Sequence, residues 1–384
     1  NMIDELRRSH HITIVFPVNG YNCLAAMNKL KEIWPEVTFR PYPYFKQLCH
    51  LDFLICKAKR AFDLAFKSEC NSFKVERILK PYGYVVNGKF MKFVNRVICE
   101  QSPDIIQVEF YPYLKIVNYL PVVIKKVFVH HEIRFVRNAR ELSKLEVSDE
   151  QKSYAEKIKF EEIENLNKYD EVITLTDVDR DILMKNGVKT SISVSPAAVN
   201  TPVLQHKVWN KTIVFLGGRF HAPNVEGMNW MSKYVLPLID WRNRYKDVSF
   251  IVIGTGWTPK MITGIPRNNL KIMGFVENIQ SVAYGGIMVV PILSGSGMRM
   301  KILEAAAMGM PIVTTSVGKE GIELVNGESC LIADTPTDFA KAIEDLMSNE
   351  TVMKTIADNA QKVFKNNYSK EALAMRRNLI YKKL

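Results

Sequence analysis

The sequence predicts an α/β protein made of two doubly wound domains, in which parallel sheets are covered by helices. Three observations carry this prediction. Short apolar segments alternate with helical ones along almost the whole chain. The 384 residues exceed what one ordinary domain needs and suffice for two hydrophobic cores. Residues 196–211 are polar, contain proline and show no periodicity, so they are the expected linker.

The first half of the chain is expected to form a domain over residues 1–198. Its strands are predicted at residues 12–17, 105–109, 126–130, 171–175 and 191–195. Helices are predicted between them, and the longest runs from about residue 149 to residue 168.

The second half repeats this pattern and is expected to form a domain over residues 199–368. Its strands are predicted at residues 212–216, 249–254, 270–273, 287–290, 312–315 and 330–333. Its helices are predicted at residues 224–241, 300–308, 336–348 and 350–366. The remaining segment, residues 369–384, is amphipathic and basic.

Composition and charge narrow the functional classes. The chain is 47% hydrophobic and 24% charged, has no apolar run long enough to span a bilayer, and does not open with a secretory signal. Its net charge is +12, and residues 1–144 hold 23 Lys and Arg against 13 Asp and Glu, a surplus of 10. Between residues 42 and 96, 11 basic residues stand against 4 acidic ones, interleaved with aromatics. No nucleic-acid-binding motif accompanies them, so a solvated basic face and a surface for anionic lipid remain as alternatives.

The six cysteines form no Cys-x-x-Cys motif and no zinc-like pairing with the seven histidines. This pattern favours reduced, mostly buried thiols in a cytoplasmic protein. Peripheral binding to the inner face of the membrane is the alternative localisation that the basic first domain leaves open.

The most informative motif follows the strand predicted at residues 287–290. Gly295 and Gly297 in the turn permit positive φ and close backbone approach, and the helix that follows offers free N–H groups to an anion. Arg299 and Lys301 add two cationic side chains, while Glu304 lies where a carboxylate can accept ribose hydroxyls. The combination favours a nucleoside diphosphate over the plainer interpretation of a βα turn with solvated basic residues.

At these residues the chain resembles the retaining, nucleotide-sugar-dependent glycosyltransferases of family 4, which have the GT-B fold. The matching motif is Gly-Ser-Gly-x-Arg-x-Lys-Ile-Leu-Glu-Ala followed by Gly-x-Pro-Ile-Val. Further similar segments are Phe-Leu-Gly-Gly-Arg at residues 215–219, Ile-Val-Ile-Gly-Thr-Gly at 251–256 and Gly-Phe-Val-Glu-Asn at 274–278. The resemblance extends over roughly residues 95 to 370 and is strongest after residue 210.

This resemblance implies two Rossmann-like domains that face a cleft, with the acceptor side in the first and the nucleotide-sugar site in the second. In that fold the last helix, here residues 369–384, crosses back onto the first domain. The implied reaction moves a sugar from an NDP-sugar to a glycan or lipid-linked acceptor with retention, in cell-surface polysaccharide or glycoconjugate synthesis. The NDP-sugar is a substrate, and neither a cofactor nor a metal is implied, because basic side chains and a helix N-terminus neutralise the diphosphate.

The resemblance also assigns residues. The residues matched to catalysis are His131, Arg219 and Lys301. Those matched to donor binding are Gly218, Arg219, Gly274, Val276, Gly295, Ser296, Gly297, Met298, Arg299, Lys301 and Glu304. Two positions depart from the broad family: Ser296 stands where a carboxylate is frequent, and Asn224 where a lysine is frequent. We expect Arg299 and Lys301 to compensate for that lysine at the diphosphate.

In the first domain, the candidate residues follow strands. His131 matches the family histidine beside the transferred sugar, His130 is the alternative if the register slips by one residue, and Glu109 ends another strand. The segment before residue 12 resembles the end of the family's first helix, so the domain is expected to lack the family's first strand and glycine-rich loop. The alternative is that the first domain departs from the family pattern at this point. Two alternative functions remain: a GT-B sugar epimerase and a catalytically weak nucleotide-sugar-binding protein.

Overall fold

The computed structural model describes residues 2–18, 21–43, 70–80, 86–204, 209–295 and 297–384. Most of the basic and aromatic stretch between residues 42 and 96, and also Ser296, lie outside these residues. The chain divides into two compact units. The N-terminal unit comprises Met2–Ser195 and Arg376–Leu384, and the C-terminal unit comprises Pro196–Met375.

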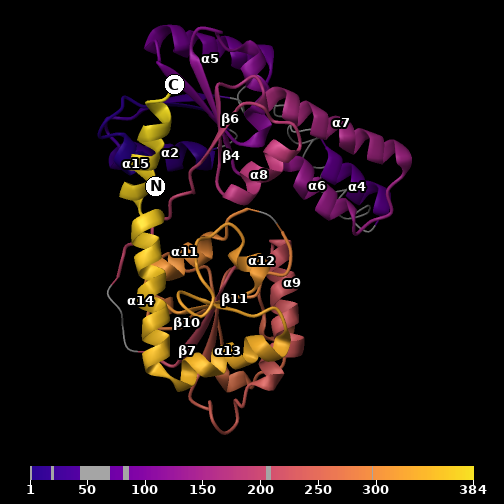
Figure 1. The fold of residues 1–384 in the computed structure, drawn as a ribbon, viewed down its shortest axis with the longest axis vertical. Helices are drawn as coiled ribbons and strands as arrows, with labels where there is room; N and C mark the ends of the chain where they lie inside the picture. The colour runs from indigo at the N-terminus through magenta and orange to yellow at the C-terminus, as the bar shows by residue number, and fades with distance from the viewer. Residues whose placement is uncertain (1, 19–20, 44–69, 81–85, 205–208, 296) are drawn as a thin grey trace. The chain divides into compact units, whose positions relative to one another are not determined.

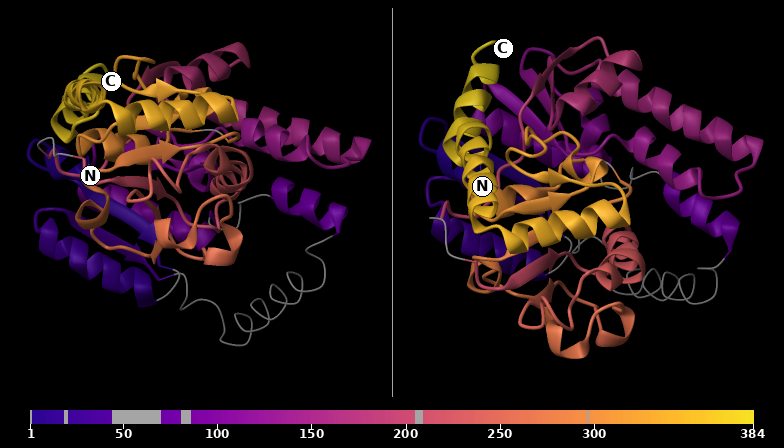
Figure 2. Two further views of the ribbon diagram at one scale, coloured as in Figure 1. Left: turned by 90° about the horizontal axis from the view of Figure 1, so that it is seen from below. Right: turned by 60° about the horizontal axis from the view of Figure 1, so that its bottom comes forward.

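The C-terminal unit is built on a six-stranded sheet in which every pairing is parallel. The strand order is β12-β11-β10-β7-β8-β9. The strands span β7 Thr212–Leu216, β8 Ser249–Ile253, β9 Leu270–Gly274, β10 Ile287–Val290, β11 Ile312–Thr314 and β12 Leu331–Ile332. Figures 1 and 2 show helices on either side of this sheet, the arrangement that a doubly wound fold requires. The predicted α/β fold class is confirmed.

Alternation along these strands supplies two cores, one on each face of the sheet. Phe215 and Phe250 belong to one buried cluster together with Phe339 of α13 (Pro336–Ser348). Val214 and Met288, which are paired with each other in register, belong to the other cluster with α11 (Met300–Ala307) and the end of α14 (Glu350–Asn367). Because parallel sheets are covered on both faces, their strands are apolar on both sides, as the sequence shows.

The helix predicted at residues 224–241 is shorter than expected. The α-helix α9 spans Ala222–Trp230, a π-helical turn follows at Met231–Val235, and a 3-10 turn closes at Leu236–Leu238. Pro237 has no N–H to donate to the preceding turn, so the α-helix cannot continue through it. The prediction of one uninterrupted helix here is wrong.

The described residues of the N-terminal unit form two parallel sheets. The larger has the order β3-β4-β5-β6, and its strands are β3 Ile105–Glu109, β4 Lys125–His130, β5 Glu171–Thr174 and β6 Ser191–Val194. The smaller pairs β1 Thr13–Pro17 with β2 Thr38–Tyr42. The pattern did not predict β2, which contains Arg40 and Pro41 and has no apolar run.

Helices surround these strands. They are α1 Ile3–Leu6, α2 Tyr21–Ile33, α4 Asn71–Leu79, α5 Gly88–Gln101, the 3-10 helix η2 Tyr111–Tyr119, α6 Arg134–Leu142, α7 Asp149–Leu166 and α8 Asp177–Lys185. The last helix of the chain, α15 (Lys370–Tyr381), enters this unit at Arg376. It is attached by hydrogen bonds from Arg377 Nε to Ser195 Oγ (3.3 Å) and between His10 Nε2 and Asn378 Oδ1 (2.6 Å).

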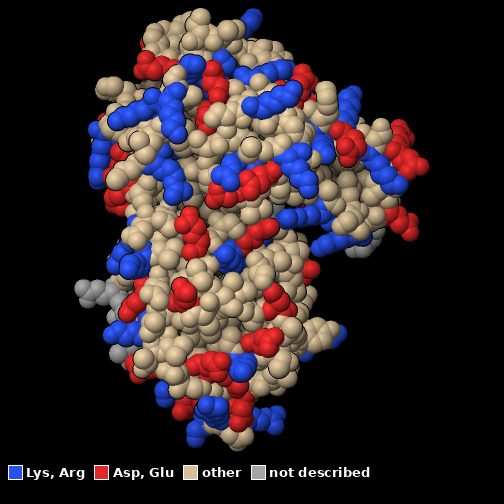
Figure 3. Space-filling model, viewed as in Figure 1, with Lys and Arg blue, Asp and Glu red and all other residues tan. Residues whose placement is uncertain are grey.

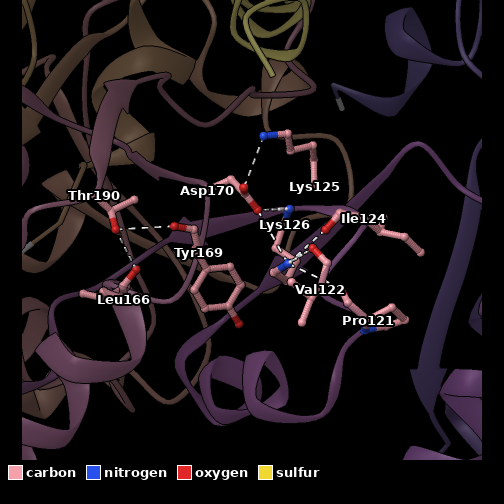
Figure 4. Close-up of polar contacts among 9 residues, drawn as sticks. All are labelled: Pro121, Val122, Ile124, Lys125, Lys126, Leu166, Tyr169, Asp170 and Thr190. Carbon is pink, nitrogen blue, oxygen red and sulfur yellow. Dashed lines mark hydrogen bonds and ion pairs between the residues drawn. The ribbon is translucent and has the colours of Figure 1, made fainter.

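A buried lysine organises the loop before β4 (Figure 4). Lys126 is 8% exposed, and its ammonium donates to three loop carbonyls at 3.0 to 3.4 Å, those of Pro121, Val122 and Ile124. Asp170 accepts from the Lys126 backbone N–H at 2.8 Å and lies 3.7 Å from its ammonium. A buried charge needs such partners. The loop is thereby fixed, with Val122 and Val123 more than nine-tenths exposed at its tip.

The exposure of the cysteine side chains differs from the expectation. Among the described cysteines, Cys330 is buried, but Cys23, Cys70 and Cys99 are exposed, so the expectation of mostly buried thiols is wrong for this part of the chain.

Figure 3 shows lysine and arginine side chains interspersed with acidic ones on the face that it presents. Within the described ranges, no helix combines the length and apolarity that crossing a membrane requires.

Candidate functional site

The glycine-rich turn after β10 is held against the start of α9. Gly295 and Gly297 have φ of 110° and 82°, in the region that favours glycine. A Cβ at Gly295 would lie 3.3 Å from Pro223 Cγ, so there is little room for a side chain. Ser294 Oγ donates a hydrogen bond to the carboxylate of Glu226, which ties the turn to α9. Ser294 and Gly295 are therefore held against the start of α9.

Arg299 closes this turn at the position that precedes α11. It is 9% exposed, and its guanidinium donates to the carbonyl of Gly297. The side chain thus braces the turn from within and places a positive charge beside the N-terminus of α11, where the helix dipole already favours an anion. Met298 is half-buried and packs against the core on the α11 face of the sheet.

Lys301 is held by residues that precede it by many positions in the chain. Its ammonium donates to Asn224 Oδ1 at 2.7 Å, and Asn224 Nδ2 donates to the carbonyl of Gly218 at 2.9 Å. The ammonium also lies 5.5 Å from the centre of the Phe215 ring. Asn224, which stands where the family often has lysine, is therefore a buried positioning residue that links Lys301 to the turn after β7.

The electrostatics of this cluster suit an anion. Burial, followed by the charge of Arg299, lowers the pKa of Lys301 to about 8, and the charge of Glu304 opposes both effects. Burial raises the pKa of Glu304, and Lys301 opposes that shift. Lys301 and Glu304 are thus partly desolvated beside one another. The positive charges of Lys301 and Arg299 would interact strongly with an anion bound next to them, because burial reduces screening by solvent.

Three other predicted donor residues, Arg219, Gly274 and Val276, lie at or just after the ends of β7 and β9. The Arg219 backbone N–H donates to the Thr255 carbonyl at 2.9 Å, while its side chain is exposed. Gly274 has φ of 66°, and its carbonyl accepts from the Gly254 N–H at 2.8 Å. Val276 packs against the same core as α11. The structure brings Gly218, Lys301, Arg299 and the glycine turn together, and the exposed side chain of Arg219 follows β7 directly after Gly218.

In the N-terminal unit, His131 and Glu109 form a pair at the carboxyl ends of β4 and β3. His131 Nε2 lies 2.5 Å from Glu109 Oε2, and the Phe110 ring stacks on the imidazole at 4.2 Å between centroids. Phe110 has φ of 69°, a left-handed conformation that is rare for a bulky residue and concentrates at functional sites.

His130 has a different role. It is 2% exposed and its Nε2 lies 2.9 Å from Glu162 Oε1, and the carboxylate of Glu162 also accepts from the backbone N–H groups of Arg134 and Phe135. This buried contact caps the start of α6, which has no side-chain cap of its own. His130 is therefore structural, and His131 is the histidine left at the sheet edge.

Sequence reasoning did not find four partners of these residues: Glu226, Gln107, Arg377 and Tyr381. Hydrogen bonds between distant parts of the chain join Glu226 to Ser294, and Gln107 to Arg377 and Tyr381. The sequence offers one local signal, the pairing of Gln107 and Glu109 on alternate positions of one strand.

The two units and the glycine turn define the fold of GT-B glycosyltransferases. Residues 210–349, which lie in the C-terminal unit, are similar to the family of group 1 glycosyl transferases. The chain is 31% identical over 168 residues to a 44.6 kDa protein of the cps region of Klebsiella pneumoniae. It is 28% identical over 220 residues to a glycosyltransferase of Methanocaldococcus jannaschii. These matches cover 41% and 54% of this chain and 43% and 61% of the relatives, so the chain spans about half the length of the curated relatives it matches.

Solved structures agree on the fold. HepE of Anabaena, crystallised in complex with UDP, superposes with a TM-score of 0.64 at 14% identity and covers 100% of this chain and 95% of its own. Sucrose-phosphate synthase of Thermosynechococcus elongatus superposes with a TM-score of 0.59 at 16% identity, covering 77% of each chain. At such identities, the similarity establishes the architecture alone.

Proposed function

We propose that the protein is a glycosyltransferase that moves a sugar from a nucleotide-sugar to a hydroxyl of a glycan or lipid-linked acceptor, with retention of configuration. The observation that carries the proposal is the cluster at the N-terminus of α11, where Lys301 is aligned by Asn224 and Arg299 braces the glycine turn. The match to the group 1 glycosyl transferases and the UDP complex of HepE support it.

The proposed chemistry follows from the charge that develops during transfer. As the glycosidic bond to the donor breaks, the diphosphate gains negative charge, which Lys301, Arg299 and the amides of the glycine turn stabilise. Arg219 is assigned to the same diphosphate by the family motif. Glu304 accepts the ribose hydroxyls, and Gly274 and Val276 contact the base through their backbone. His131 holds a hydroxyl of the sugar.

The context of the reaction is part of the proposal. The relative from Klebsiella pneumoniae belongs to a cps region, which supports a role in synthesis of a cell-surface polysaccharide. A lipid-linked acceptor brings the enzyme to a membrane, so we propose peripheral association with an anionic membrane surface from the cytoplasmic side.

The test is a donor screen followed by product analysis. Thermal unfolding is measured with UDP-, GDP- and ADP-sugars, because a ligand that binds the native state alone raises its melting temperature. The stabilising donor is then incubated with candidate acceptors, and the anomer of the product is read by NMR. A transferred sugar with retained configuration supports the proposal. An epimerised donor, or binding without turnover on every acceptor, overturns it in favour of an epimerase or a binding protein.

Lys301→Met provides a matched variant for this screen. It keeps the apolar stem and removes the charge, so it is expected to lose the stabilisation by UDP-sugars. Lys260→Met, at an exposed position of the same unit, is expected to retain it.

A further inference from the structure

A continuous chain of hydrogen bonds runs from the last helix to the His131 pair. Glu109, whose Oε2 meets His131, accepts at Oε1 from Gln107 Nε2 at 2.6 Å. Gln107 Oε1 in turn accepts from Tyr381 Oη at 2.5 Å and from Arg377 Nη1 at 3.3 Å. All of these residues belong to the N-terminal unit, although Gln107 and Tyr381 are separated by 274 positions.

The donor-to-acceptor direction of these hydrogen bonds is set at the α15 end, by Arg377 and Tyr381. Arg377 is 3% exposed and is anchored through Nε to Ser195 Oγ at 3.3 Å. Arginine and the Tyr381 hydroxyl both present donors to Gln107, so the carboxamide oxygen must face α15 and its NH₂ must face Glu109. An ionised carboxylate only accepts hydrogen bonds, so Glu109 requires His131 to carry its proton on Nε2.

We propose that α15 positions His131: Tyr381 and Arg377 orient Gln107, Gln107 orients Glu109, and Glu109 selects the Nε2–H tautomer of His131. Nδ1 is then left with a lone pair that accepts a hydrogen bond from a sugar hydroxyl. The role of this lone pair rests on the proposed function, whereas the tautomer does not.

Two further features point to a site in which the imidazole is held in one orientation. Phe110 covers one face of the ring at an interplanar angle of 16°. Its positive φ is a strained conformation, which the contacts around Phe110 must stabilise. The ring is thus fixed by a carboxylate at one edge and by an aromatic face, and the fixed geometry is what substrate positioning requires.

The experiment compares Tyr381→Phe, which removes one hydroxyl and keeps the ring, with Tyr119→Phe as the matched control. Tyr119 is 58% exposed in the same unit. Ring-nitrogen shifts of ¹⁵N-histidine-labelled protein report the tautomer, and loss of signals in His131→Gln assigns them. Steady-state kinetics give kcat and KM, and UDP titration gives donor affinity.

The expected result is a single Nε2–H tautomer of His131 in the wild type and in Tyr119→Phe, and a tautomer mixture in Tyr381→Phe. We expect Tyr381→Phe to lower kcat about threefold to tenfold, as the loss of one hydrogen bond in a chain implies, with UDP affinity unchanged. Glu109→Gln is expected to produce a larger change in both, because its amide can donate to Nε2 and stabilise the opposite tautomer.

Two outcomes overturn the inference: an Nδ1–H tautomer in the wild type, or a Tyr381→Phe spectrum identical to that of Tyr119→Phe. If the wild type binds UDP but transfers no sugar to any acceptor, the proposed function fails. The tautomer measurement still decides whether α15 positions His131, since it needs no turnover.

Discussion

Lys301 allows the diphosphate assignment to be tested by pH. Its pKa is about 8 because the ammonium is buried beside Arg299. A bound diphosphate stabilises the protonated form and is expected to restore at least the ordinary lysine value of about 10.4. Binding therefore takes up a proton above pH 8. Affinity is full below pH 8 and is lost as the pH rises through it.

The magnitude follows from these two values. In the ligand-free protein, Lys301 is deprotonated in about one-tenth of the molecules at pH 7 and in about nine-tenths at pH 9. The dissociation constant for UDP is therefore expected to rise about tenfold between these two pH values. Calorimetric titration with UDP at the two pH values measures this change. Uridine serves as the reference ligand, because it shares the nucleobase titration and lacks the phosphates.

Lys301→Met is the decisive variant. It is expected to weaken UDP binding at pH 7 by about 1.5–3 kcal/mol, the range for a charge-assisted hydrogen bond, and to abolish the additional pH dependence. Lys260→Met is the control at an exposed lysine. If UDP and uridine weaken equally between pH 7 and pH 9, or if the variant keeps the wild-type slope, Lys301 does not bind the diphosphate.

Three other predictions follow from the same contacts. Glu304→Ala is expected to weaken UDP binding by about 1.5–3 kcal/mol and to equalise the affinities for UDP and its 2′-deoxy analogue; a preserved preference for the ribose form removes Glu304 from that role. Transferase activity is expected to persist in EDTA, and a loss that Mg²⁺ or Mn²⁺ restores contradicts a mechanism based on basic side chains. Glu162→Ala is expected to lower the free energy of unfolding by about 3–5 kcal/mol, since it strands His130 in the core. Urea unfolding measures this loss, and Glu164→Ala on the exposed face of α7 should change it little.

Much of the fold was predictable because strand and helix signals are local. The strands at β3, β7 and β10 lie at the predicted residues, since each is a short apolar run between turn residues. β2 was missed because it contains a proline and shows little alternation of apolar and polar residues. The end of α9 was misplaced because the apolar pattern continues from Trp230 to Trp241. Pro237 lies within this segment and cannot be accommodated in the interior of an α-helix.

The glycine turn, Arg299 and Lys301 could be named as candidates from the sequence because they share one short motif, and His131 because it directly follows a strand. Their partners depend on the tertiary fold. Lys301 meets Asn224 from 77 positions away, and Gln107 meets Arg377 from 270 positions away. The physical reason is that backbone conformation is set by near neighbours along the chain. A buried polar group must instead be satisfied by whatever the closed fold brings within hydrogen-bonding distance.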